Sequence, residues 1–431
     1  MSEPPAPDAA GPGPERTDAA GPDSDGPASA GPDSGGLSAL LRDRSIVICC
    51  GSGGAGKTTT SAAIALAGAI AGLRTCVVTI DPARRLADAL GVGRLTNEPK
   101  RIEGSWSGEL YAVMLDAKRT FDDLVERYSA DPEQAERILG NRLYRNLTSA
   151  LSGTQEYMAA EKLYELNASG AFDLVVVDTP PTRNALDFLD APGRLTRFLE
   201  NRVFRLLLMP TRMSLKALTV ATQALLRTIS KVAGSEIVED AMAFFRAFEG
   251  MEEGFRERAR GVEALLSDPG TAFLLVAVPR RDSVVEARFF ADRLAEAHQP
   301  VAALVVNRLH PDFGSGEVAL SVPGTDPPIR DLPGTDPPAS SGEVASTRPA
   351  NLASRPELSP EDAARALAGM RKNLADFQAL ADEERAYLAA LESKVGGTVV
   401  RVPYLSRDVH DLAGLLLVAG CLVGNVRSEG D

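Results

Sequence analysis

Residues 45–73 read SIVICCGSGGAGKTTTSAAIALAGAIAGL. An apolar run, Ser45–Cys50, precedes the spacing G-x-x-x-x-G-K-T at Gly51–Thr58, and a run of small residues, Ser61–Leu73, follows it. This order of strand, glycine loop and helix is typical of a phosphate-binding loop, in which backbone N–H groups and the helix dipole surround an anion. We expect Lys57 to contact the β- and γ-phosphates and the Thr58 hydroxyl to ligate Mg²⁺. The sequence therefore predicts binding of a nucleoside triphosphate, rather than a glycine-rich turn without a ligand.

The charge balance argues against nucleic acid as a partner. The 431-residue chain has 46 Lys and Arg against 59 Asp and Glu, a net charge of -13, and no dense basic cluster. A protein that follows a nucleic-acid backbone needs such a cluster. With 44% apolar and 24% charged residues, the composition is that of a globular protein, and the length allows one α/β domain with insertions or two domains.

No segment reads as membrane-spanning or secretory. The longest apolar runs, Ser61–Leu73 and Leu412–Gly424, are shorter than the roughly 20 residues that cross a bilayer. The N-terminus has neither the basic start nor the apolar stretch of a signal peptide. The cysteines form no C-x-x-C motif, and we expect buried thiols of a cytoplasmic protein rather than zinc or metalloid ligands. These cysteines are Cys49, Cys50, Cys76 and Cys421.

Apolar runs separated by helical segments predict an α/β fold with a doubly wound, mainly parallel sheet. Most runs are continuous rather than alternating, as in strands buried on both faces. Helical connections between them imply β-α-β crossovers. The predicted strands are the run that ends at Cys50, then Thr75–Ile80, Leu110–Leu115, Leu174–Asp178, Ala272–Val278, Val301–Val306 and Thr398–Val402.

The predicted P-loop domain covers residues 37–424 and is interrupted twice. Residues 195–266 are helical in pattern throughout and read as an all-helical insertion. Residues 311–355 contain Pro-Gly-Thr-Asp-Pro-Pro twice, at 323–328 and 333–338, which predicts a disordered low-complexity loop. Residues 1–36, rich in Gly, Pro and Asp, are predicted to be a disordered tail, and residues 425–431 a C-terminal tail.

Order is expected to resume at Ser359, an N-cap residue before Pro360 at the first helical position. Apolar residues then recur near a 3–4 spacing, which favours a helix packed within the chain and leaves a short coiled-coil contact as the alternative. These residues are Leu367, Met370, Leu374, Phe377, Leu388 and Leu391.

Two aspartates follow predicted strands directly. Asp178 ends the run Leu174–Val177, and a carboxylate at that edge of a parallel strand faces the phosphates and holds Mg²⁺ through water. The alternative for Asp178 is to cap the next turn, which its apolar strand and the following Thr-Pro-Pro-Thr disfavour. Asp81 follows the second strand, where it could position the attacking water, cap a helix before Pro82, or do both. Spacing alone favours neither role for Asp81.

Five motifs, in chain order, resemble the ArsA-type anion-transporting ATPase family. They are GSGGAGKTTT, TIDPARRLADAL, VVVDTPPT, VVNRL and VPYLSRDVHDL. That family includes the arsenite-pump ATPase subunit and the ATPase that targets tail-anchored membrane proteins, and it belongs to the deviant-Walker-A class. The resemblance runs from about residue 44 to 424 and leaves out residues 1–36 and 311–355.

The resemblance implies an ATP- and Mg²⁺-dependent ATPase. It places Asp81 in switch I as the residue that orients water, and Asp178 in switch II with Thr58 on Mg²⁺. Asn307 and Arg308 would lie by the adenine, and Pro403 would line the base pocket. The ATP-binding loop would consist of Gly51, Ser52, Gly53, Gly54, Ala55, Gly56, Lys57, Thr58 and Thr59.

The resemblance also implies partners. These would be a second copy or a paralogous ATPase in a dimer, and a membrane-protein client or transporter at the inner face of the membrane. In the targeting relatives the helical insertion forms an apolar groove for a membrane helix. Here Leu206–Met209, Met213 and the face from Met242 to Phe255 could line such a groove, or they pack as ordinary helices over the nucleotide domain.

Three departures from the family pattern bear on activity. Ser52 stands where the class has a lysine that reaches the partner subunit's phosphates. The C-x-x-C pair that binds zinc between subunits is missing, and Arg183 and Asn184 replace a glycine and a histidine of switch II. We therefore carry two hypotheses, an ATPase that handles a membrane-associated client and a weakly hydrolysing or non-hydrolysing ATP-bound subunit that regulates a heterodimer. A kinase or transferase on the same loop would need an acceptor site, and none is recognisable.

Overall fold

A computed structural model describes residues 36–81, 83–145, 154–180, 187–200, 235–313 and 359–424. Most of the predicted tail at 1–36, most of the low-complexity loop at 311–355 and residues 425–431 lie outside these ranges. So do Leu206–Met209, Met213, Arg183 and Asn184, which the sequence analysis singled out.

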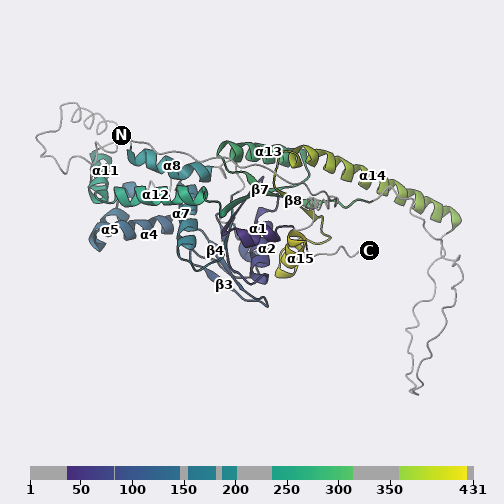
Figure 1. The fold of residues 1–431 in the computed structure, drawn as a ribbon, viewed down its shortest axis with the longest axis horizontal. Helices are drawn as coiled ribbons and strands as arrows, with labels where there is room; N and C mark the ends of the chain where they lie inside the picture. Colours follow the sequence, from purple (N-terminus) through teal and green to yellow (C-terminus); the bar gives the residue numbers. More distant parts are fainter. Residues whose placement is uncertain are drawn as a thin grey trace, which may run out of the picture.

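Eight strands form one sheet in the order β3-β4-β2-β5-β1-β6-β7-β8 (Figure 1). All neighbouring pairs are parallel except β3 with β4, so the predicted mainly parallel, doubly wound α/β sheet is confirmed. The strands are β1 (Ile46–Gly51), β2 (Arg74–Thr79), β3 (Lys100–Ile102), β4 (Glu109–Met114), β5 (Leu174–Asp178), β6 (Thr271–Ala277), β7 (Val301–Leu309) and β8 (Thr398–Pro403). The edge strand β3 was not predicted, because it has three residues and only Ile102 is buried.

Both faces of the sheet are covered, which explains the continuous apolar strands. Along β1, Val47 and Cys49 belong to the core on one face, and Ile46, Ile48 and Cys50 belong to the core on the other. The first face carries α1 (Ser38–Asp43), α2 (Lys57–Ile70), α3 (Arg85–Ala89) and α15 (Leu412–Val423). The second carries α7 (Thr154–Ala168), α8 (Asp187–Glu200), α12 (Glu252–Leu266), α13 (Arg281–Glu296) and the end of α14 (Pro360–Glu392).

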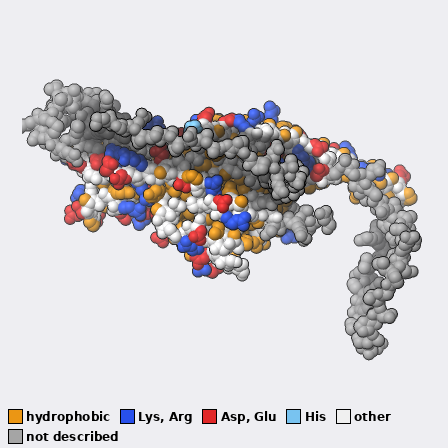
Figure 2. All heavy atoms as spheres, in the orientation of Figure 1, with side chains coloured by type: hydrophobic (Ala, Val, Ile, Leu, Met, Phe, Trp, Pro, Cys, Tyr) orange, Lys and Arg blue, Asp and Glu red, His pale blue; other side chains and the backbone are white. Residues whose placement is uncertain are grey.

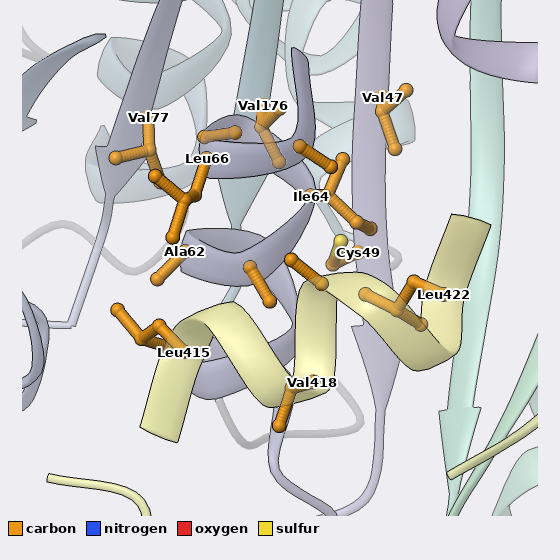
Figure 3. Close-up of a cluster of buried hydrophobic side chains, with 14 of the residues drawn as sticks. Val47, Cys49, Ala62, Ile64, Leu66, Val77, Val176, Leu415, Val418 and Leu422 are labelled. Atoms are coloured by element: carbon orange, nitrogen blue, oxygen red, sulfur yellow. The ribbon is translucent and has the colours of Figure 1, made fainter. Parts of the chain in front are cut away.

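The small residues of α2 let this helix lie close to the sheet. A side chain on Gly68 would meet the side chains of Thr75 and Leu174, so α2 approaches β2 and β5 too closely for a larger residue. Figure 3 shows the packed layers, in which strand residues face α2 and α15 lies across α2. The labelled members are Val47, Cys49, Ala62, Ile64, Leu66, Val77, Val176, Leu415, Val418 and Leu422.

A helical layer lies beyond one end of the sheet (Figure 1). It combines α4 (Ala117–Tyr128) and α5 (Pro132–Leu139) with α11 (Ser235–Phe248) and α12, so it draws on two parts of the chain rather than on residues 195–266 alone. Phe248 and Phe255 are buried in it, with ring centroids 5.2 Å apart. Ordinary helix packing therefore accounts for this described part of the face from Met242 to Phe255.

Helix α14 begins as predicted, because the Ser359 hydroxyl accepts a hydrogen bond from the Asp362 N–H and Pro360 is the first helical residue. Only its C-terminal half packs on the sheet, through residues that include Glu384 and Leu388. The N-terminal half projects from the body of the molecule (Figure 1), and Met370 there is 65% exposed. Packing within the chain is thus confirmed for the C-terminal half alone.

Within the ranges that the structure covers, no helix is both long and apolar enough to cross a membrane. The face seen in Figure 2 carries acidic and basic side chains interspersed with apolar ones. Cys49 and Cys50 lie in β1, Cys76 in β2 and Cys421 in α15; the first three are buried as expected, whereas Cys421 is half-buried.

Candidate nucleotide-binding site

The loop between β1 and α2 has a backbone that only glycine adopts comfortably. Gly51, Gly54 and Gly56 have φ of 150°, 75° and 94°. A side chain on Gly51 would meet the Val276 carbonyl, and one on Gly56 would meet the Asn307 amide nitrogen. The loop is therefore fixed both by its own backbone and by β6 and β7 beside it.

The loop lies at a point in the sheet where the chain changes direction. After β1 the chain passes to β2 on one side, and after β5 it crosses β1 to reach β6 on the other side. Ligands of open α/β sheets bind at such a switch point, beyond the carboxyl ends of the strands. The N-terminus of α2 opens there with Gly56 as its N-cap, which has no side chain to accept the N–H groups of the first turn. Those N–H groups are available to an anion.

Lys57 is folded over the loop. Its Nζ donates to the carbonyls of Gly51 at 3.1 Å and Ser52 at 3.0 Å, and its side chain is buried. Burial lowers the pKa of the Lys57 ammonium, and the nearby Asp178 carboxylate opposes that shift. A buried ammonium with neutral carbonyl partners is a favourable place for a phosphate oxygen.

Asp178 ends β5 beneath the loop and has one carboxylate oxygen in use. Thr58 Oγ1 and Thr79 Oγ1 donate to Asp178 Oδ2 at 2.8 and 2.9 Å. Asp178 Oδ1 is buried and has no hydrogen-bond partner among the residues described. Burial raises the pKa of the Asp178 carboxyl to about 6. Because Mg²⁺ prefers oxygen ligands, a carboxylate with an unpaired Oδ1, whose Oδ2 is bonded to the Thr58 hydroxyl, fits this cation.

Asp81 lies just beyond β2, half-buried at the mouth of the site. Its Oδ1 accepts a hydrogen bond from the Ala83 N–H at 3.0 Å, which fixes the carboxylate by a local turn. The next helix, α3, has Arg84 as its N-cap and no side-chain cap bond, so Asp81 does not cap it. Of the two roles left open for Asp81, the helix cap is therefore wrong.

Two adjoining cavities bring the predicted residues together. The larger, of about 830 Å³, extends over the loop toward β7, β8 and α13. It is lined by residues that include Ser52, Gly53, Gly54, Gly56, Thr59, Asn307, Arg308 and Pro403. The smaller, of about 320 Å³, lies on the phosphate side and is lined by residues that include Gly54, Gly56, Lys57, Thr58, Thr59, Asp81 and Arg308. Gly51, Ala55 and Asp178 are buried beneath these walls.

The far end of the larger cavity contains a cluster that the sequence did not indicate. The His310 backbone N–H donates to Glu384 Oε2 at 3.0 Å, and His310 Nδ1 lies 2.8 Å from Glu384 Oε1. The His310 ring stacks on Tyr404 with centroids 5.1 Å apart and planes 8° from parallel. Glu384 comes from α14, 74 residues along the chain, and no local pattern marks any of the three.

Asn307 and Tyr404 tie this end to the loop and to β7. Asn307 Nδ2 donates to the Ala55 carbonyl at 2.9 Å, and the Tyr404 N–H donates to the Leu309 carbonyl at 2.8 Å. Pro403, which the resemblance places at the base, lines the cavity next to Tyr404. The two cavities together thus offer a phosphate end made of backbone and a second end made of ring faces and amide groups.

Comparison with known proteins agrees with this geometry. The model of the family described as "Anion-transporting ATPase" matches residues 44–317, more than half of the chain. The chain belongs to this family. It is 29% identical over 260 residues to the "ATPase ASNA1 homolog" of Cryptosporidium parvum (strain Iowa II), covering 60% of this chain and 63% of that protein.

Two further relatives of this chain are similar over comparable lengths. The "Uncharacterized protein SCO2128" of Streptomyces coelicolor is 32% identical over 274 residues, covering 63% of this chain and 64% of that protein. The "ATPase GET3A" of Arabidopsis thaliana is 26% identical over 262 residues, covering 60% of this chain and 65% of that protein. The chain thus matches less than two thirds of the length of these three relatives.

The Ser52 side chain is turned into its own subunit. It is buried, and its Oγ lies 2.7 Å from Ser283 Oγ at the start of α13. Ser283 Oγ also accepts a hydrogen bond from the Val278 N–H at 3.2 Å. Position 52, where the resemblance predicts a lysine that reaches a partner, therefore holds an uncharged group that links the loop to α13. Ser283 was missed, because it is 231 residues away in the chain.

Proposed function

We propose that this chain is an Mg²⁺-dependent ATPase that converts ATP to ADP and phosphate. The observation that carries the proposal is the Thr58–Asp178 pair, whose unpaired carboxylate oxygen lies beneath a glycine loop that also holds Lys57. A nucleotide-binding loop alone indicates binding, whereas a buried carboxylate beside the Thr58 hydroxyl indicates metal-dependent phosphoryl chemistry. Membership in the anion-transporting ATPase family supports the same reaction.

The proposed role of each residue follows from its position in the site. The N–H groups of the loop and of the first turn of α2 bind the phosphate oxygens, and Lys57 leaves its carbonyl partners to contact them. Thr58 and Asp178 would hold Mg²⁺, which supplies positive charge to the phosphate oxygens when it is bound. Asp81 orients a water molecule for attack and accepts its proton. Asn307 and Pro403 position the base.

We further propose that nucleotide state controls assembly with a partner. The resemblance supports a homodimer or a heterodimer with a paralogous ATPase. It also supports a membrane-protein client or transporter, handled by a cytoplasmic protein that associates peripherally with the inner face of the membrane. The uncharged, inward-facing Ser52 supports a second candidate, a subunit that binds ATP but hydrolyses it weakly and regulates a catalytic partner.

The variant Asp81→Asn tests the choice between these functions. We expect the purified wild-type chain to release phosphate from ATP with Mg²⁺, and D81N to bind ATP with similar affinity while its turnover falls about 100-fold, the usual size of a general-base effect. Phosphate release and titration calorimetry measure the two quantities. The matched control is Asp268→Asn, because Asp268 Oδ1 makes the same local bond, to the Gly270 N–H, far from the site.

Other outcomes of these measurements would decide against the ATPase or against both candidate functions. Equal turnover of wild type and D81N, at a low level that rises only when a paralogous ATPase is added, would favour the regulatory subunit. Absence of ATP binding by the wild-type chain would overturn both candidates. Sedimentation with ATP and with ADP tests the assembly step, and an unchanged mass in both states would contradict it.

A further inference from the structure

Arg308 occupies an irregularity near the end of β7. Val306 pairs with Arg401 of β8 and Leu309 pairs with Pro403, so β7 has one more residue than its neighbour across this interval. Arg308 has a φ of 60°, in the left-handed region that side chains rarely adopt. Such a bulge changes the direction of a side chain and occurs often next to active sites.

The bulge brings two consecutive side chains to the same loop. In a regular strand, residues 307 and 308 would point to opposite faces of the sheet. Here Asn307 bonds to the Ala55 carbonyl, and Arg308 lines both cavities together with Gly54, Gly56 and Thr59. Arg308 thus lies where the smaller cavity, on the phosphate side, joins the larger cavity.

The positive charge of Arg308 is not paired with any other group among the residues that the structure describes. Its side chain is exposed, and it makes no hydrogen bond or ion pair with another residue of the ranges covered. Lys57 and Arg85 are the other Lys and Arg residues that line the smaller cavity, and neither lines the larger one. Ser52 contributes no charge, because it is neutral and paired with Ser283.

We propose that Arg308 binds the phosphates of the nucleotide from within the same subunit and supplies a positive charge that Ser52 does not. The inference rests on the proposed function and goes beyond it, because the family resemblance would place Arg308 at the adenine. The guanidinium fork donates to two phosphate oxygens at once. An arginine in this role stabilises the charge that accumulates on the phosphoryl oxygens during transfer.

The variant Arg308→Gly separates the charge from the backbone. Glycine adopts a positive φ without strain, so the bulge is retained while the guanidinium is lost. We expect turnover of ATP with Mg²⁺ to fall about 100-fold, below the full effect of an arginine supplied to phosphoryl transfer. In calorimetry we expect R308G to bind ATP about 10-fold more weakly and AMP as tightly as wild type. Arg308→Lys should recover only part of the loss, because it keeps the charge without the fork.

His298→Gly is the matched control. His298 is the other described non-glycine residue with a positive φ, 58°, and it follows α13. H298G and R308G should both unfold at the same temperature as wild type or higher, and only R308G should lose ATP binding and turnover.

Several results would overturn the proposal. Full turnover in R308G would do so, as would an equal loss of ATP and AMP affinity, which assigns Arg308 to the base or ribose. The same pattern of losses in Arg85→Gln but not in R308G would move the role to α3. If wild type binds ATP without hydrolysing it, the proposed hydrolysis fails, whereas the ATP and AMP calorimetry still decides for or against Arg308.

Discussion

The two ends of the nucleotide site are built in different ways. The phosphate end is built around one contiguous stretch, Gly51–Thr59, which acts through backbone N–H groups and a buried lysine and to which other strands add single side chains such as Asp178. The other end is assembled from β7, α14 and the segment after β8, and it acts through side chains such as Asn307, His310 and Tyr404. We infer that phosphate binding is mainly a local property of the sequence, to which the fold adds Asp178 and the proposed Arg308, whereas base binding depends on tertiary structure throughout. Changes at the first end should abolish function, and changes at the second should adjust it.

The largest effect is expected at the point where the two ends meet. In Gly56→Ala, a residue with φ of 94° gains a side chain that meets the Asn307 amide. The left-handed backbone alone costs about 1–2 kcal/mol for alanine. The displaced Asn307 also loses its bond to the Ala55 carbonyl, and the loop N–H groups shift. We expect ATP turnover to fall at least about 100-fold, since misplacement of about 1 Å has effects of that size.

Gly72→Ala controls for the backbone cost in this experiment. Gly72 has a φ of 93° in the turn after α2, and a side chain there would meet nothing within 4 Å. G72A should lose similar stability in thermal unfolding and keep its turnover. If the double variant G56A/N307A recovers turnover, the contact with Asn307 is the cause. If G56A itself turns over ATP normally, the phosphate end is not fixed by its backbone.

The second prediction concerns the buried carboxyl of the phosphate end. The pKa of Asp178 rises from the usual 3.8 to about 6 in the folded chain. The folded state therefore binds more protons than the unfolded state between these values, and stability falls as pH rises from about 4 to 6. At 1.36 kcal/mol per pKa unit, this carboxyl lowers the free energy of unfolding above pH 6 by up to about 3 kcal/mol. Asp178→Asn should remove this pH dependence and unfold at a higher temperature at pH 7, while Mg²⁺-dependent turnover is lost.

Asp173→Asn, just before the other end of β5, should change the stability at pH 7 in the opposite direction. Arg74 donates to Asp173 and lowers the pKa of its carboxyl, so that pair stabilises the chain at neutral pH and stops doing so in acid. D173N should therefore be slightly less stable at pH 7 and retain turnover. Thermal unfolding between pH 4 and 7, with and without Mg²⁺, measures the stability of D178N and of D173N. A D178N variant that is less stable than wild type at pH 7 would contradict the burial argument.

The contrast between the ends also explains what the sequence could predict. The loop, Asp178 and seven of the eight strands follow from contiguous patterns, in which spacing and apolar runs carry the information. Asn307 and Pro403 came from the family resemblance, since a strand-end asparagine and a proline have no chemical signature of their own. The bulge that places Arg308 beside the loop depends on pairing between β7 and β8, which no local pattern encodes.

Long-range contacts account for the remaining misses. Ser283 and Glu384 act on residues 231 and 74 positions away, and each is an ordinary residue of an amphipathic helix until the fold places it. The sequence predicts a helical insertion at residues 195–266, but not that α4 and α5, which lie before β5 in the chain, pack against α11 and α12 of that region. In each case the deciding factor is which surface the helix packs on, and periodicity does not identify that surface.

The smallest effect is expected at the base end, in Glu384→Ala. This change leaves the His310 backbone N–H without its acceptor and frees the ring that stacks on Tyr404. A hydrogen bond to a charged group, such as this half-buried bond to Glu384, contributes about 1.5–3 kcal/mol. We expect a loss of stability in that range and a rise in the KM for ATP of roughly 10-fold, at 1.4 kcal/mol per factor of ten, with kcat nearly unchanged because the phosphate end is intact.

Two further measurements test whether the effect of E384A is confined to the base end. Inorganic tripolyphosphate, which has no base, should compete with ATP equally well in E384A and in wild type. Glu161→Ala is the matched variant, because Glu161 is also buried, at 2% exposed against 7% for Glu384. Its ion pair with Arg258 joins α7 to α12, and neither residue lines the two cavities. E161A should lose stability and keep its KM. If tripolyphosphate binding falls in E384A as much as ATP binding does, the two ends are coupled through α14, and the division between a local phosphate end and an assembled base end does not hold.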